Sequence, residues 1–181
     1  MRGFKVALAT VAAGAMLGAT ACSYDPATNA DSTEETTTTP ALLDVSQADY
    51  AEQQAAHLRE DARNIVKLSR HFQEQDDVSD ETKAIAAEAE SIFQAQIDGL
   101  DEVKDKGSSM LTDSEVERIE SDSGSHLDMA YLTMLETHVP RLLDAWNGMQ
   151  EAGSEPVRNV ARETFPKLEA LNNKVQNRLS Y

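Results

Sequence analysis

The chain has little cysteine, few aromatic residues and few prolines, and each shortage excludes something. Its single cysteine, Cys22, cannot form a disulfide within the chain. Aromatic residues make up 5% of the sequence and prolines number five, whereas alanine, glutamate, glutamine, aspartate and leucine are abundant. This composition favours helices over a sheet, so we expect an all-α fold.

Positive charge is also scarce. The chain has 16 lysines and arginines against 32 aspartates and glutamates, which gives a formal net charge of -16 at pH 7. A surface this negative repels phosphate backbones and anionic lipid headgroups, so we expect no nucleic-acid partner. Solubility alone is the simpler interpretation of the charge, and attraction of cations is the other.

Known catalytic motifs are missing from the sequence. It contains no nucleophile elbow, no phosphate-binding loop and no zinc-type His-Glu-x-x-His. It also has no Glu-x-x-His, the motif that di-iron helical bundles need on facing helices. We therefore expect a protein that is not an enzyme.

The one long apolar run lies at the N-terminus. Arg2 and Lys5 precede apolar residues 6–21, and the small residues Ala19, Thr20 and Ala21 end the run. A charged start, a short apolar stretch and small residues at its end are typical of an export signal. The run is too short for a comfortable membrane span, so we expect residues 1–21 to be a signal peptide.

Cys22 directly follows that segment. Residues 17–22, Leu-Gly-Ala-Thr-Ala-Cys, resemble a bacterial lipoprotein box, with Ala19 where the commonest form has leucine. Ordinary cleavage before an unmodified cysteine is the alternative. Because the only cysteine stands where an anchor would be attached, we expect Cys22 to be lipidated. Its acyl chains would hold an exported protein at the outer face of the cell membrane.

Residues 22–45 are rich in threonine and poor in apolar side chains. Such a segment buries too little apolar area to offset the entropy of ordering it. We expect a disordered tether between the anchor and a folded domain at residues 46–181.

Helical periodicity governs the rest of the chain. Ser46, Ser79 and Ser154 are predicted N-caps, and residues 112–115, Thr-Asp-Ser-Glu, form a capping box. The predicted helices cover residues 46–75, 79–107, 112–122, 125–152 and from 154 towards the C-terminus.

The two halves of this domain repeat a pattern. Tyr50 lies seven residues before His57, and Tyr131 lies seven before His138. Residues 79–88 also match residues 154–163 in step. We therefore predict two tandem helical hairpins packed as an antiparallel four-helix bundle, with a short linking helix between the second and third long helices. In that arrangement the first and third long helices run parallel, and the two histidines face each other at equal height.

These histidines are the candidate metal ligands. Met134 and His138 lie one turn apart on the apolar stripe of residues 126–149, and His57 would add a third ligand. Imidazole and thioether groups suit copper and similar transition metals, and Asp61, one turn after His57, would orient its ring. The alternative is that a histidine or methionine on an apolar stripe packs in the core. Trp146 has the same two interpretations, core packing or partner binding.

A family resemblance rests on residues in both halves. In the first half the matching residues are Asp49, Tyr50, Ala51, His57, Ile85, Ala86, Gln96 and Ile97, and in the second they are Gly124, Leu127, Asp128, Tyr131, Leu132, Met134 and His138. They resemble bacterial domain-of-unknown-function family 305, and residues 161–171 resemble family 4142. The resemblance implies an exported, ferritin-like four-helix bundle with a His-His pair in each half, and copper binding in some members.

The sequence departs from that family at the ligand positions. Leu58 and Val139 stand where the second histidine of each pair would be, and Gln54 and Leu135 replace methionines. The resemblance therefore implies the fold and the export more than the metal. We expect a non-catalytic binding or structural domain whose protein partner the sequence leaves open. Copper or other transition-metal binding through His57, Met134 and His138 is the alternative.

Overall fold

The computed structural model describes residues 47–104 and 106–180. The chain divides between Pro40 and Ala41, and every described residue belongs to the second part. The predicted signal peptide, Cys22, the predicted tether and the Ser46 cap all lie outside the described residues. No helix within the described ranges is long and apolar enough to cross a membrane.

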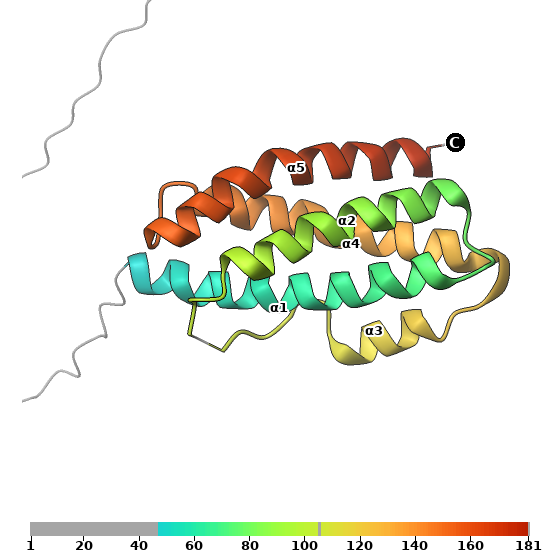
Figure 1. The fold of residues 1–181 in the computed structure, drawn as a ribbon, viewed down its shortest axis with the longest axis horizontal. Helices are drawn as coiled ribbons and strands as arrows, with labels where there is room; N and C mark the ends of the chain where they lie inside the picture. The colour runs from blue at the N-terminus through green and yellow to red at the C-terminus, as the bar shows by residue number, and fades with distance from the viewer. Residues whose placement is uncertain (1–46, 105, 181) are drawn as a thin grey trace, which may run out of the picture. The chain divides into compact units, whose positions relative to one another are not determined.

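The described residues form helices and contain no strand, which confirms the all-α fold class (Figure 1). The helices, in chain order, are α1 (Gln47–Glu74), α2 (Asp80–Gly99), α3 (Asp113–Glu120), the short 3-10 helix η1 (Gly124–His126), α4 (Leu127–Met149) and α5 (Glu155–Leu179).

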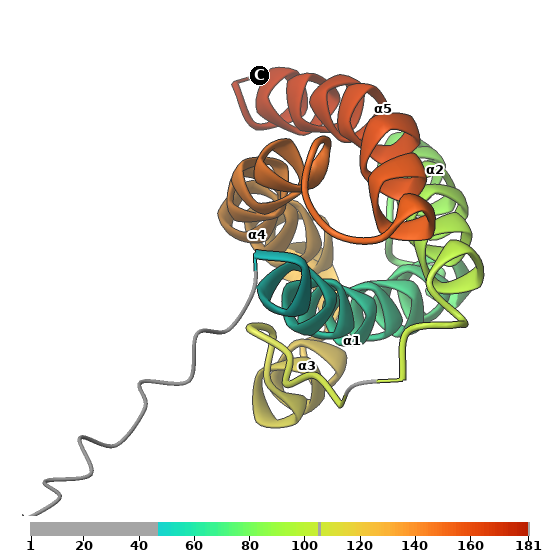
Figure 2. The ribbon, with the colours of Figure 1, turned by 90° about the vertical axis from the view of Figure 1, so that its left-hand side faces the viewer.

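The four long helices enclose one apolar core. Seen end-on, α1, α2, α4 and α5 surround a common interior, and α3 lies outside this group beside α1 (Figure 2). The neighbouring pairs are α1 with α2, α2 with α5, α5 with α4, and α4 with α1. Their buried faces follow the apolar stripes of the sequence, as burial of one stripe per helix requires.

Three hydrogen bonds fix the directions of the helices. The Ser69 hydroxyl near the end of α1 lies 2.7 Å from the Tyr131 hydroxyl near the start of α4. The backbone N–H of Ser154, just after α4, donates to the Glu52 carboxylate near the start of α1 (3.1 Å), and that of Ser79, just before α2, donates to the Asp128 carboxylate (3.0 Å). Helices α1 and α4 therefore run in opposite directions, and the prediction that they run parallel is wrong.

Helices α1 and α4 run in opposite directions because of the path that the chain takes between α2 and α4. The chain leaves α2 through the connecting segment, by which we mean the described residues 100–104 and 106–112, and continues into α3. Both run beside α1 in its own direction, as the contact of Lys67 in α1 with Glu120 at the end of α3 shows (2.9 Å). This passage returns the chain to the level where α2 began, so α4 starts at that level and runs in the same direction as α2 (Figure 1).

The predicted end of the second helix is also wrong. We expected it to end at Gly107, but α2 ends at Gly99. The Arg59 guanidinium of α1 donates to the Leu100 carbonyl (2.9 Å) and to the Val103 carbonyl. Because a side chain of another helix occupies these carbonyls, the backbone leaves the helical path there. The caps at Ser79 and Thr112 are confirmed, since their side chains accept hydrogen bonds from the N–H groups of Thr82 and Glu115.

The core contains most of the large side chains, and Trp146 is among its fully buried members. Phe72 and Tyr131 pack with ring centroids 4.8 Å apart. Burial raises the pKa of the Tyr131 phenol well above its ordinary value, so the group remains a neutral hydroxyl bonded to Ser69. Around the level of Trp146 the neighbouring helices contribute small residues, which leaves room for the indole: Ala51, Ala55 and Ala161 are each at most 1% exposed.

Gly107 is required by a close approach of two backbones. A Cβ atom at this position would lie 2.1 Å from the Ala56 carbonyl oxygen and 2.5 Å from the His57 nitrogen. Real Cβ atoms do not come so close, and a helix backbone has little freedom to move away. Gly148, in α4, is the opposite case, because a Cβ atom there would meet nothing within 4 Å.

These two glycines form a matched pair for mutagenesis. We expect Gly107→Ala to lower the free energy of unfolding by about 2 kcal/mol or more, because the connecting segment must move off α1. We expect Gly148→Ala to raise it by about 0.5–1 kcal/mol, because alanine suits a helix interior better than glycine. Urea denaturation measures both. Equal effects of the two substitutions would contradict the close packing of the segment on α1.

Candidate functional site

The candidate site is built on a polar stripe of α1. His57, Asp61 and Asn64 follow one another at helical spacing, so they share one face of the helix. That face contacts the connecting segment, because all three side chains hydrogen-bond residues between Ser108 and Leu111. This polar face of α1 therefore holds the connecting segment, which has no regular secondary structure at these residues.

Asp61 is the centre of this arrangement. Only 2% of the residue is exposed, and its Oδ1 accepts three hydrogen bonds. The donors are the Ser109 hydroxyl (2.6 Å) and the backbone N–H groups of Met110 (2.7 Å) and Leu111 (3.2 Å). The amide of Asn64 adds a bond to the Leu111 carbonyl (2.7 Å). Oδ2 of Asp61 is buried and has no hydrogen-bond partner among the described residues.

His57 holds the same segment at Ser108. Its Nδ1 lies 2.7 Å from the Ser108 backbone nitrogen and 3.2 Å from the Ser108 hydroxyl oxygen. A serine hydroxyl beside an imidazole is the usual pairing of nucleophile and base. The same Nδ1 also lies 2.9 Å from the Ser108 carbonyl oxygen, so it pairs with the Ser108 backbone in either ring tautomer, as acceptor from the N–H or as donor to the carbonyl. The pair therefore serves to fix the backbone.

A cavity of about 210 Å³ opens beside these residues. Asp61 and Leu58 are its buried members, and Arg141 reaches it from α4 with an exposed side chain. Its full lining is Gln54, His57, Leu58, Asp61, Ser108, Ser109, Met110, Arg141 and Ala145. Asp61 and Arg141, which carry opposite charges, thus border the same small space.

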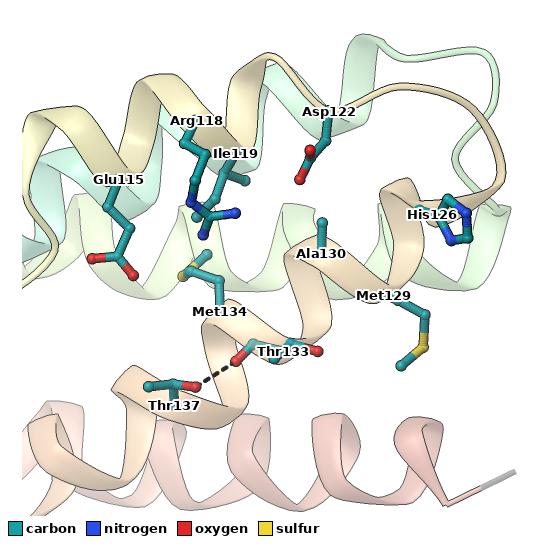
Figure 3. A pocket seen from close by; sticks show the side chains of 10 residues that line it. All are labelled: Glu115, Arg118, Ile119, Asp122, His126, Met129, Ala130, Thr133, Met134 and Thr137. Atoms are coloured by element: carbon teal, nitrogen blue, oxygen red, sulfur yellow. Dashed lines mark hydrogen bonds between the residues drawn. The ribbon is translucent and has the colours of Figure 1, made fainter.

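A second hollow lies between α3 and α4. This groove has a volume of about 370 Å³, and α3 contributes Glu115, Arg118 and Ile119 to it (Figure 3). Glu115 lies at one end and His126 at the other, and Met134 points into the space between the helices (Figure 3). Thr137 donates its hydroxyl proton to the Thr133 carbonyl of its own helix (2.8 Å), so this hydroxyl can only accept a hydrogen bond from a ligand.

The predicted metal ligands have different neighbours. His57 contacts Ser108 of the connecting segment, whereas His138 is 4% exposed and its Nε2 lies 3.5 Å from Glu115 Oε1 of α3. Met134 is 4% exposed and lines the α3–α4 groove. Asp61 bonds the connecting segment rather than the His57 ring. Across residues 47–104 and 106–180, no three histidine, cysteine or acidic side chains group in a way that could hold a metal ion.

Sequence reasoning missed Ser108, Ser109 and Arg141. Nothing near these residues in the sequence marks them, since their partners lie about 50 residues away for the serines. One signal was present, the spacing of His57, Asp61 and Asn64 on a helix whose other face is apolar. Comparison of the chain with protein-family models, with characterised proteins and with solved structures finds no match.

We expect Asp61→Ala to lower the free energy of unfolding by about 2–4 kcal/mol, because three donors lose a charged acceptor at once. Asp61→Asn should cost less, since an amide oxygen still accepts. The exposed Asp98 of α2 is the control, and Asp98→Ala should change stability by less than about 0.5 kcal/mol. Hydrogen exchange at Met110 and Leu111 gives the local measurement. Unchanged exchange there in Asp61→Ala would show that the carboxylate does not hold the segment.

Proposed function

We propose that this protein is a membrane-anchored extracytoplasmic lipoprotein whose helical domain binds or supports another molecule without catalysis. The observation that carries the non-catalytic part is the use of His57 and Asp61. Their Nδ1 and Oδ1 atoms, which would serve acid-base chemistry, are bonded to the backbone of the connecting segment. Side chains that hold the backbone through these bonds are fixed in place, which supports a structural or binding role for them.

We propose further that the domain is a four-helix bundle of the ferritin-like kind. The enclosure of one core by α1, α2, α4 and α5 supports this, as does the resemblance to family 305. The two hairpins of the proposed tandem origin would be α1 with α2 and α4 with α5, the two pairs that are connected in sequence and in contact. Because α1 and α4 run in opposite directions, an axis relating these hairpins would lie across the helices.

The proposed anchor rests on residues 17–22, and the proposed tether on the threonine-rich stretch that follows. Acyl chains on Cys22 would retain the protein at the membrane, whereas the strongly acidic domain would be repelled by anionic lipids and held away from the surface. Such a protein presents its ligand sites to the extracytoplasmic space.

Cys22→Ser tests the anchor. We expect mass spectrometry of the native N-terminus to show acyl chains on Cys22, and the protein to sediment with membranes. The Cys22→Ser variant should lose the modification and leave the membrane fraction, and Ser23→Ala should behave as the unchanged chain does. An unmodified cysteine in the native protein would disprove the lipoprotein proposal.

Transition-metal binding is the second proposal, and one feature of the α3–α4 region favours it. His138 Nε2 and Glu115 Oε1 are 3.5 Å apart, and Met134, one turn before His138, lines the same groove as Glu115. Imidazole, thioether and carboxylate are all ligands that copper accepts. The site would then centre on His138 and Met134, and His57 would be its least favoured member.

Calorimetric titration with Cu(I) and Cu(II) tests this second proposal. If copper is bound there, His138→Ala should weaken the affinity by about tenfold or more, and Met134→Leu should weaken Cu(I) more than Cu(II). His71→Ala, near the end of α1, is the matched control and should bind as the unchanged protein does. Absence of binding by the unchanged protein, or equal affinity in His138→Ala, would eliminate the proposal.

A further inference from the structure

Asp61 has an oxygen that the fold does not use. Its Oδ1 accepts three hydrogen bonds, but Oδ2 accepts none from the described residues although it is buried. Buried polar atoms in folded proteins are almost always paired, because an unpaired one loses its bonds to water without replacement. Asp61 also lines the cavity of about 210 Å³, so a small ligand held there would lie against this side chain.

The chemistry of the surroundings selects a nitrogen donor over a metal ion. Calcium takes six or more oxygen ligands, and zinc takes four nitrogen, sulfur or oxygen ligands. Asp61 is the only carboxylate in the cavity lining, and its other oxygen is already saturated with donors. A protonated amine needs no such set, because each of its N–H groups makes one hydrogen bond.

The opposite charge is supplied by α4. Arg141 lines the same cavity with an exposed side chain, and it forms no hydrogen bond or ion pair with any other described residue. A guanidinium binds a carboxylate through two parallel hydrogen bonds, which makes arginine the usual residue for this purpose. His57 and the hydroxyls of Ser108 and Ser109 supply further polar groups, and Leu58 and Ala145 supply an apolar wall.

We propose that this cavity binds a small free α-amino acid, with its ammonium group on Asp61 Oδ2 and its carboxylate on Arg141. An α-amino acid carries both charges on one carbon, and the cavity is smaller than the 300–1,000 Å³ typical of sites for larger ligands. The inference rests on the binding role proposed above and names its ligand class.

Calorimetry with the full-length protein tests the ligand class. Glycine, L-alanine and L-serine are the probes. N-acetyl-L-alanine lacks the ammonium group and L-alanine amide lacks the carboxylate, so both should bind at least tenfold more weakly than L-alanine. If the amide binds as well as L-alanine, the ligand is a simple amine and the proposal is wrong. If none of the three amino acids binds, the proposal is likewise overturned.

Two variants connect binding to the named residues. Arg141→Gln should weaken L-alanine binding at least tenfold without changing the melting temperature, because its side chain is exposed and otherwise unbonded. Arg162→Gln, an equal change of charge at an exposed position of α5, should bind L-alanine as the unchanged protein does. If Arg141→Gln binds L-alanine with unchanged affinity, the proposal is overturned. This result does not depend on whether the Asp61→Asn variant folds.

Asp61→Asn adds a separate measurement in the same experiment. The amide keeps an oxygen for the connecting segment but places an NH₂ group where the carboxylate faces the ligand, so the variant should fold and should lose binding of L-alanine. This outcome is independent of the anchor. A protein that is lipidated on Cys22 but binds no amino acid would retain the proposed location and lose only the ligand assigned here.

Discussion

The capture of the connecting segment by α1 is the interaction on which the rest of the structure depends. Arg59 donates hydrogen bonds to carbonyls that follow α2, and Asp61 accepts hydrogen bonds from N–H groups that precede α3. Between them Gly107 lets the two backbones touch. A chain held at both ends in this way has to run along α1, and α3 therefore lies beside α1 and outside the group of four helices. The starting point of α4 follows from that course.

Much of the fold was predictable because it depends on neighbours in sequence. Helical periodicity located all the long helices, and the caps at Ser79 and Thr112 follow from side chains that reach N–H groups three residues on. The direction of α4 was not predictable in the same way. It depends on contacts between α1 and residues about 50 positions later, and no periodicity records such contacts. Gly107 is an example. Its sequence context predicts a helix end, but the glycine is required because the backbone of the connecting segment lies against the backbone of α1 at Ala56.

The candidate site was predictable only in part, for a related reason. The spacing of Tyr50 with His57 and of Tyr131 with His138 suggests equivalent positions, yet Tyr50 is 59% exposed and Tyr131 is fully buried. Tyr131 has Ser69 and Phe72 of α1 as partners in the core. A repeated spacing preserves the face of a helix but not what packs against it. The sequence pointed to His57 and Asp61 as members of a metal site, whereas the structure bonds both to residues of the connecting segment that carry no sign of this in the sequence.

The two ends of the domain differ in how their interiors are filled. Around Phe72 and Tyr131 the core is closed by aromatic rings, with its one hydroxyl pair satisfied. The other end contains Trp146 and Gln96, both fully or almost fully buried, whose side-chain polar atoms have no partner among the described residues.

The heights of Gln96 and Trp146 can be compared, because α2 and α4 begin at the same level, where Ser79 bonds Asp128, and run in one direction (Figure 1). Gln96 lies 17 residues after Ser79, and Trp146 lies 18 residues after Asp128, so at 1.5 Å per residue their heights differ by about 1.5 Å. Helices α2 and α4 stand on opposite sides of the interior (Figure 2), so the two unpaired side chains belong to one level of the core. The Asp61 cavity opens at this same end, since Ala145 is part of its wall. Among the described residues, Trp146, Gln96 and Asp61 thus leave unpaired polar atoms in the half of the domain where the binding site is proposed, whereas those of Asn172 and Arg178 lie towards the aromatic end, where Arg178 approaches Asp128.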